Sequence, residues 1–175
     1  KKVIEHVFRL VERFENVGFS MNLSSSDITN ESIRELIEKK LRVCSSPERV
    51  YFEILESEGV DDYNIVNDFI NKVRAYDCKI SIDDFGSGYS NYYRILELDI
   101  DTIKIDGSII KKLPFDQNAR YLLQTIIDFA ARQGYNVVAE FVSSEEILAE
   151  IKKFGIKYAQ GFLLGKPMLP DNIKE

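Results

Sequence analysis

Apolar residues recur along the chain with two different spacings, and segments with one spacing alternate with segments that have the other. Short stretches in which every second residue is apolar predict strands, and longer stretches with apolar residues at i, i+3 and i+4 predict helices. Strands are expected at 19–23, 50–55, 80–83, 102–106, 136–140 and 158–161. Helices are expected at 1–15, 31–41, 65–73, 89–96, 118–132 and 144–154. Because strands and helices alternate throughout, the pattern predicts an α/β fold with a parallel sheet covered by helices.

The apolar stripes of these helices predict which side chains form the core. For helix 1–15 the stripe comprises Ile4, Val7, Phe8, Val11 and Phe14. For helix 118–132 it comprises Leu122, Leu123, Ile126 and Ile127. The last helix is expected to begin with a capping box between Ser143 and Glu146. No linker, low-complexity tract or internal repeat interrupts the pattern, so residues 1–175 are expected to form a single domain.

The number of strands leaves two architectures open. A closed (β/α)8 barrel has eight strands and typically about 250 residues. This chain has 175 residues and six expected strands. It is therefore either an open α/β sheet or a barrel that lacks its first part.

Composition and charge narrow the possible classes of protein. With 45% hydrophobic and 30% charged residues, the chain has the composition of a globular protein. The formal net charge of −6 provides no basic footprint, so no DNA partner is expected. No apolar run is long enough to cross a bilayer, and no signal peptide is recognisable. Cys44 and Cys78 lack metal or redox spacing and are expected to be reduced thiols in a cytoplasmic protein.

The scarcity of histidine restricts the chemistry further. His6 is the only histidine, and it lies in the first expected helix, where a surface position is predicted. Ser-His-Asp catalysis, His-rich zinc sites and two-His iron sites are therefore disfavoured. Any bound metal must be held mainly by oxygen atoms of Asp, Glu and Asn.

Polar side chains stand at or near the carboxyl end of every expected strand. In chain order they are Asn22, Glu53, Asp83 with Asp84, Lys104 with Asp106, Glu140 and Gln160. That edge holds the functional site in barrels and open parallel sheets alike. One such residue alone is more often a solvated loop residue, but burying so much like charge would be costly without a function. Carboxylates around one lysine suit a two-metal centre acting on a phosphate ester.

A glycine-rich turn, Phe85-Gly86-Ser87-Gly88, follows the adjacent carboxylates of Asp83 and Asp84. In isolation, such a pair is either an acidic turn capped by glycines or a site for hard divalent cations, which relieve the repulsion between the carboxylates. The turn lacks the Gly-Lys-Ser/Thr ending of a P-loop and is expected to be a mobile loop at the site. Glu56 is either a surface residue or a tether for this loop.

These segments together resemble one known family, the EAL-domain phosphodiesterases of bacterial cyclic di-GMP signalling. The resemblance covers residues from about 20 to 169. The segments that carry it are Met21-Asn22-Leu23-Ser24, Phe52-Glu53-Ile54-Leu55-Glu56-Ser57, Asp83-Asp84-Phe85-Gly86-Ser87-Gly88-Tyr89-Ser90, Ile103-Lys104-Ile105-Asp106, Ala139-Glu140, Gln160-Gly161-Phe162 and Gly165-Lys166-Pro167-Met168.

The resemblance implies a modified (β/α)8 TIM-like barrel that hydrolyses cyclic di-GMP to linear pGpG with two Mg2+ or Mn2+ ions. The implied metal ligands are Asn22, Glu53, Asp83, Asp84 and Glu140. Lys104 would position the attacking water, so that Lys104, Glu140, Glu53 and Asp83 are the expected catalytic residues. Glu56 would hold the loop that includes Phe85, Gly86, Ser87 and Gly88 in its working shape. Gln160 would help to orient the site, and Asp106 would lie near the substrate or the second metal.

Two departures from the family pattern lower the expected activity of this chain. The Glu-Ala-Leu motif is absent; in the family it lies on a strand upstream of the helix that opens this chain. The first two barrel strands and one metal ligand are therefore expected to be missing, and turnover by this chain alone is not expected. In addition, the family's Ala-Glu-Gly-Val-Glu reads Ala139-Glu140-Phe141-Val142-Ser143 here, so that Ser143 replaces the second glutamate.

The resemblance also implies partners. Family members often dimerise through the loop and helix after the Asp pair, which predicts a homodimer and gives the aromatic residues at 89–93 a role. A sensory or GGDEF-type domain upstream would fit a cytoplasmic parent protein or the cytoplasmic part of a membrane-anchored one.

Two other functions stay open. One is a non-catalytic cyclic di-GMP receptor or interaction domain with the same fold. The retention of six site residues argues against it: Asn22, Glu53, Asp83, Asp84, Lys104 and Glu140. The other is an enolase-like or glycosidase barrel. The absence of Trp modestly weakens the sugar-binding version of this second alternative.

Overall fold

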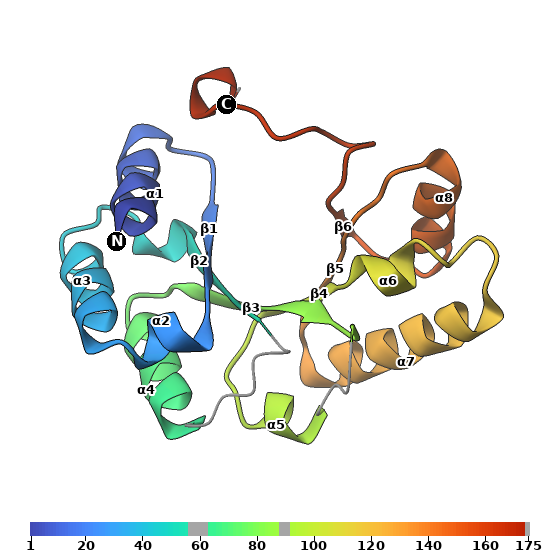
Figure 1. Ribbon diagram of the computed structural model, residues 1–175, viewed down its shortest axis with the longest axis horizontal. Coiled ribbons are helices and arrows are strands. Elements are labelled where there is room, and N and C mark those ends of the chain that lie inside the picture. Colours follow the sequence, from blue (N-terminus) through green and yellow to red (C-terminus); the bar gives the residue numbers. More distant parts are fainter. Residues whose placement is uncertain (56–62, 88–91, 174–175) are drawn as a thin grey trace. The chain divides into compact units, whose positions relative to one another are not determined.

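A computed structural model describes residues 1–55, 63–87 and 92–173 (Figure 1). The strands are β1 (Phe19–Leu23), β2 (Val50–Leu55), β3 (Lys79–Phe85), β4 (Thr102–Ile105), β5 (Asn136–Ala139) and β6 (Tyr158–Ala159). The α-helices are α1 (Lys2–Arg13), α2 (Ser25–Thr29), α3 (Glu31–Leu41), α4 (Tyr63–Arg74), α5 (Tyr92–Leu96), α6 (Gly107–Ile110), α7 (Gln117–Gln133) and α8 (Glu145–Lys153). Short 3-10 turns lie at Pro47–Arg49 and Pro170–Asn172. The predicted alternation of strands and helices is confirmed.

The six strands follow one another in the order β1-β2-β3-β4-β5-β6 in one sheet. Parallel pairing joins β1 to β2, β4 to β5 and β5 to β6. The expected α/β fold with a parallel sheet is therefore confirmed. Within the described residues β1 and β6 stand at the two ends of this order, which is that of an open sheet and not of a closed barrel.

The chain divides into two compact units, and β3 runs from one into the other. The first unit holds the described residues within Lys1–Ser81, Asn91–Ile100 and Leu169–Glu175. Here α3 lies beside α4, and α1 contacts both α3 and β1 (Figure 1). The whole predicted stripe of α1, Ile4 to Phe14, is buried, while His6 is exposed as expected. The apolar faces of these helices thus form the core of the first unit.

The second unit comprises the described residues within Ile82–Ser90 and Asp101–Met168. Its longest helix, α7, contacts α6 and β5 (Figure 1). The side chain of Asp116 caps the start of α7 by accepting hydrogen bonds from two backbone N–H groups, and Gly134 ends the helix with φ +76°. These caps fix the position of the helix that supports the polar strand ends.

The buried stripe of α7 differs from the predicted one. It consists of Ala119, Leu123, Ile126 and Ala130, and Leu122 is 41% exposed. Residues at i, i+4, i+7 and i+11 lie along one face of a helix, and Leu122 points about 70° away from the middle of that face. The prediction that Leu122 is in the core was therefore wrong.

The predicted capping box of α8 is also wrong by one residue. Ser144, not Ser143, is the N-cap, and its hydroxyl accepts a hydrogen bond from the backbone N–H of Ile147 at 3.3 Å. Backbone hydrogen bonds hold Val142 to Gln160 and Leu163, so the chain is still outside the helix at that point. With Ile147 as the third helical residue, no glutamate is placed to complete the box.

Other details complete the comparison with the sequence. The short helix α2 was not predicted, and β6 spans two residues instead of the four expected. Cys44 and Cys78 are both free, as expected; Cys78 is buried and Cys44 is half-buried. Among the described residues, no helix combines the length and the hydrophobicity needed to cross a membrane.

Candidate functional site

A buried lysine lies between two carboxylates at the carboxyl ends of the strands in the second unit. The ammonium of Lys104, on β4, donates a hydrogen bond to Asp83 Oδ1 at 2.9 Å, and Asp83 lies on β3. The same nitrogen lies 2.9 Å from Oε1 of Glu140, which directly follows β5. All three residues are at most 8% exposed. Buried charges are tolerated only where they are paired, so the three side chains form one electrostatic unit.

Backbone hydrogen bonds explain why these side chains meet. The N–H of Asp106 donates to the carbonyl of Phe85 at 3.1 Å, which ties the ends of β3 and β4 together. The N–H of Glu140 donates to Ile105 at 3.2 Å, and the N–H of Gln160 donates to Ala139 at 2.8 Å. The carboxyl ends of the four strands of this unit therefore lie at one edge, as parallel pairing requires.

Asp84 adds a third carboxylate to the cluster. Its backbone has φ +55°, and its N–H donates to Asp83 Oδ1 at 3.2 Å. Asp83, Asp84 and Glu140 each offer one oxygen atom, and these oxygens lie within 4.8 Å of one another. Within the described residues, this is the group of side chains that could hold a metal ion.

The electrostatics of the cluster also fit a cation. Burial raises the pKa of Asp84, and the nearby carboxylates of Asp83 and Asp106 raise it further, while Lys104 opposes the shift. Burial likewise raises the pKa of Glu140 well above its ordinary value, against the opposing effect of Lys104. Crowded carboxylates with raised pKa values gain from an added positive charge, and their oxygen atoms are the ligands that Mg2+ and Mn2+ prefer.

The first unit holds the other two predicted ligands. Asn22 and Glu53 are register partners near the carboxyl ends of the paired strands β1 and β2. Asn22 is exposed and Glu53 is half-buried. The structure thus brings the predicted ligands together as two sets, one in each compact unit.

The remaining predicted residues have the following positions. Phe85 is fully buried, Gly86 has φ +88° and Ser87 is exposed. Asp106 caps α6, because its carboxylate accepts a hydrogen bond from the N–H of Ser108 at 2.9 Å. Gln160 is exposed at the end of β6. The predicted tether Glu56 and the loop residue Gly88 lie outside the described residues.

A cavity of about 750 Å3 opens beside Glu140. Its lining also includes Gln160, Lys111, Phe141, Phe162 and Lys166. Lys111 and Phe141 were not predicted to belong to the site. A large apolar residue directly after Glu140, where the resemblance implies glycine, marks Phe141 as unusual but does not place it in a cavity.

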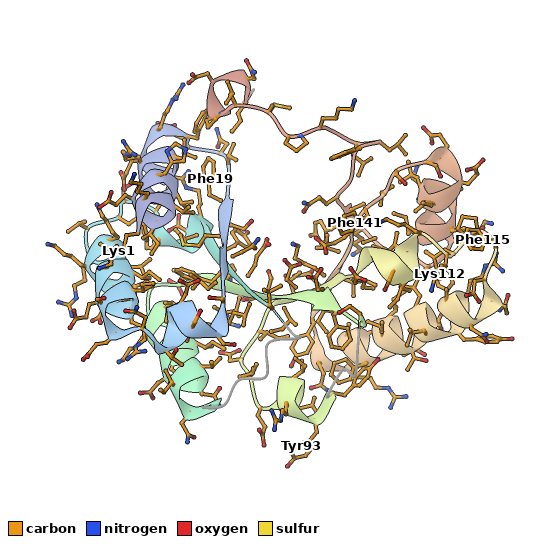
Figure 2. All side chains as sticks on the ribbon, viewed as in Figure 1. Lys1, Phe19, Tyr93, Lys112, Phe115 and Phe141 are labelled. Carbon is orange, nitrogen blue, oxygen red and sulfur yellow. The ribbon has the colours of Figure 1, made fainter. Side chains whose placement is uncertain are left out.

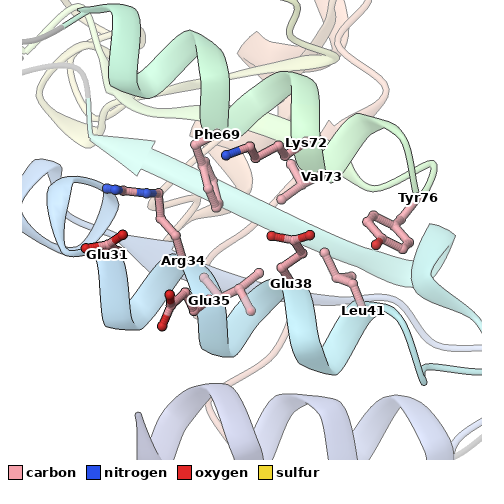
Figure 3. Close-up of a pocket in the computed structure, with 10 residues that line it drawn as sticks. Glu31, Arg34, Glu35, Glu38, Leu41, Phe69, Lys72, Val73 and Tyr76 are labelled. Atoms are coloured by element: carbon pink, nitrogen blue, oxygen red, sulfur yellow. The ribbon is translucent and has the colours of Figure 1, made fainter.

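A second hollow, of about 250 Å3, lies in the first unit between α3 and α4 (Figure 3). Its rim carries side chains of both signs, and two of these side chains contact other groups. Arg34 donates to the carbonyl of Ile28, and Glu38 pairs with Arg42 at 2.5 Å. This hollow is therefore a poorer candidate for an active site than the cavity beside Glu140.

Comparison with known proteins identifies the family. The family model described as EAL domain matches residues 1–167. The chain belongs to the EAL domain family. Among curated EAL relatives, it is 33% identical to the cyclic di-GMP phosphodiesterase PdeB of Shewanella oneidensis, over 85% of this chain and 17% of that protein. It is 34% identical to the probable cyclic di-GMP phosphodiesterase PdeA of Escherichia coli, over 85% of this chain and 21% of that protein.

Solved EAL structures share the fold. The EAL domain of Mycobacterium smegmatis DcpA superposes with a TM-score of 0.86 at 27% identity, covering 97% of this chain and 78% of that one. The PaMucR phosphodiesterase in complex with c-di-GMP gives a TM-score of 0.86 at 26% identity, covering 95% and 70% of the two chains. The chain spans about a fifth of the length of the curated EAL relatives named above.

Proposed function

We propose that residues 1–175 belong to a single EAL-type phosphodiesterase domain, which in its complete form hydrolyses cyclic di-GMP to linear pGpG with Mg2+ or Mn2+. The observation that carries the proposal is the group of Asp83, Asp84 and Glu140 around Lys104 at the strand ends. Curated relatives named as cyclic di-GMP phosphodiesterases support the choice of substrate.

The proposed roles follow from the chemistry of the side chains. Asn22, Glu53, Asp83, Asp84 and Glu140 would hold two divalent ions. When bound, these ions supply Lewis-acid charge for the phosphodiester oxygens. Glu56 would keep the loop after Asp84 in its working shape, and Gln160 and Asp106 would help to orient the ligand.

Lys104 is proposed to position the attacking water. Its ammonium is held at 2.9 Å by both Asp83 and Glu140, so its direction is fixed before the substrate arrives. An ammonium is a donor in all three of its N–H groups and accepts no hydrogen bond. A fixed donor of this kind orients a water oxygen and stabilises negative charge that develops on it.

The cavity next to Glu140 supports a ligand of nucleotide size. Its volume of about 750 Å3 lies within the range of small-molecule sites. Lys111 and Lys166 in its lining supply positive charge for phosphate groups in a chain that is acidic overall.

The proposal is tested by incubating cyclic di-GMP with the natural protein that carries this sequence. We expect linear pGpG to accumulate with Mg2+ or Mn2+, with no product in EDTA. Glu53→Ala should abolish the activity, whereas Lys153→Met, at an exposed ion pair far along α8, should leave it unchanged. Undiminished turnover by the Glu53→Ala protein would contradict the assigned role of Glu53. Tight binding without turnover would instead support a receptor.

A further inference from the structure

Phe141 has an unusual backbone conformation and an unusual environment. Its φ of +55° lies in the left-handed region, which costs conformational energy for any residue with a Cβ atom. The side chain is 51% exposed although it is large and apolar. It directly follows Glu140, a member of the carboxylate cluster. A strained, exposed aromatic residue beside a candidate catalytic cluster calls for a functional explanation.

Two residues of the α6 segment hold the ring in place. Gly107, the first residue of α6, packs against one edge of Phe141, since a Cβ atom at Gly107 would lie 2.5 Å from Cδ2 of the ring. One helical turn later, the ammonium of Lys111 lies over the ring, 4.3 Å from its centroid. A cation over an aromatic face is a favourable contact. The glycine and the lysine therefore fix the ring orientation without burying the ring.

The ring lines the same cavity as Glu140 and Gln160. Phe141 is 51% exposed, so a flat ligand group in the cavity can reach the part of the ring that Lys111 and Gly107 leave uncovered. Stacking on an aromatic side chain is a common way in which proteins bind a nucleobase. Lys111 places a positive charge beside this surface, which suits a base that is joined to a phosphate.

We infer that Phe141, fixed by Gly107 and Lys111, is the platform on which one purine base of the bound nucleotide stacks. The inference rests on the proposed function, because it assumes that the cavity takes up cyclic di-GMP. Because Glu140 lines the same cavity, a ligand that stacks here would lie beside the carboxylate cluster. Phe141 is thus a positioning and specificity-determining residue of the same site.

The absence of Trp from the chain permits a direct test. Phe141→Trp introduces a single tryptophan whose fluorescence should fall when a guanine base stacks on it. Phe115→Trp is the matched control, because Phe115 is 77% exposed, lies in the turn between α6 and α7 and does not line the cavity (Figure 2). Each variant is titrated with cyclic di-GMP, once with EDTA and once with Ca2+. Quenching is expected in Phe141→Trp alone.

Calorimetric titration of wild type, Phe141→Leu and Phe141→Tyr completes the test. Leucine keeps the apolar volume and the backbone strain but removes the aromatic face. We expect Phe141→Leu to bind cyclic di-GMP about 5- to 150-fold more weakly and Phe141→Tyr to bind it nearly as well as wild type. Circular dichroism verifies that each variant is folded. If Phe141→Leu does not fold, the affinity of Phe141→Tyr still shows whether an aromatic ring at this position supports binding.

The two possible failures are distinguishable. Equal affinity of wild type and Phe141→Leu, with no quenching in Phe141→Trp, would overturn the stacking role and leave the proposed function intact. A wild-type protein that binds no cyclic di-GMP under either condition would overturn the proposed function and the stacking role with it.

Discussion

At the scale of single residues, the buried lysine of the second unit is the most informative feature. Lys104 contacts two carboxylates at 2.9 Å, and its side chain is only 8% exposed. Removing one member of a buried ion pair leaves an uncompensated charge, which typically costs about 3–5 kcal/mol. In this cluster the lysine is the charge that compensates Asp83 and Glu140, so its removal leaves only like charges.

We therefore expect Lys104→Met to lower the free energy of unfolding by about 3 kcal/mol at pH 8 without divalent metal. The loss should be smaller at pH 5. Burial raises the pKa of Glu140, so this carboxyl binds a proton as the pH falls, and its charge no longer needs a partner. Mn2+ should restore part of the stability by supplying the missing positive charge. Urea unfolding monitored by circular dichroism measures each of these effects.

Lys153→Met is the control for this prediction. Lys153 also forms an ion pair, with Glu150 at 2.6 Å, but its side chain is 69% exposed. Solvent-exposed ion pairs contribute less than about 1 kcal/mol. Equal losses in the two variants would show that the carboxylate cluster does not depend on the lysine charge.

The sequence identified the acidic cluster but not its aromatic neighbour, for a physical reason. Asp83, Lys104 and Glu140 could be predicted because parallel strands bring their carboxyl ends together whatever the loops do. Phe141 could not, because its role depends on contacts with Gly107 and Lys111 on a different element. Such contacts between elements do not produce a periodic pattern in the sequence.

At the scale of elements, helices and strands with strong periodicity were predicted well. β2 was predicted at its observed bounds of Val50–Leu55, and α7 within one residue at each end. The five-residue helix α2 was missed because it is too short to show a stripe. The capping box between Ser24 and Asp27 is a local sequence signal that could have predicted the start of α2.

Helix ends provide the second prediction. Gly134→Ala should destabilise the protein by about 1 kcal/mol, because Gly134 ends α7 at φ +76°, where a Cβ atom is disfavoured. A new methyl group would meet no atom within 4 Å, so the cost is one of backbone conformation alone. Urea unfolding measures the change in the free energy of unfolding.

Gly165→Ala is the matched control for this helix end. Gly165 also has no atom within 4 Å of an added Cβ, but its backbone is not in the left-handed region. The substitution should therefore be close to neutral or slightly stabilising. If both variants lost the same stability, backbone strain at the end of α7 would not be the cause.

At the scale of the whole molecule, the last prediction concerns the association of two copies of the protein. The homodimer expected through the segment after the Asp pair would involve α5. Tyr93 on this helix, labelled in Figure 2, has an exposed side chain. Its exposed fraction is 71%, and that of Leu96 is 47%. Exposed tyrosine and leucine side chains on one short helix suit a symmetric contact, in which the same surface of two copies meets itself.

We expect the protein to be dimeric at micromolar concentration and Tyr93→Ala to weaken the dimer. Truncation of a central interface tyrosine commonly costs about 2 kcal/mol, which corresponds to an increase of about 30-fold in the dimer dissociation constant. Sedimentation equilibrium measures this constant. Phe115→Ala, at a side chain that is 77% exposed in the second unit, controls for a general loss of exposed aromatic surface. A wild-type protein that stays monomeric, or a dimer that Phe115→Ala weakens as much as Tyr93→Ala does, would refute a specific contact through α5.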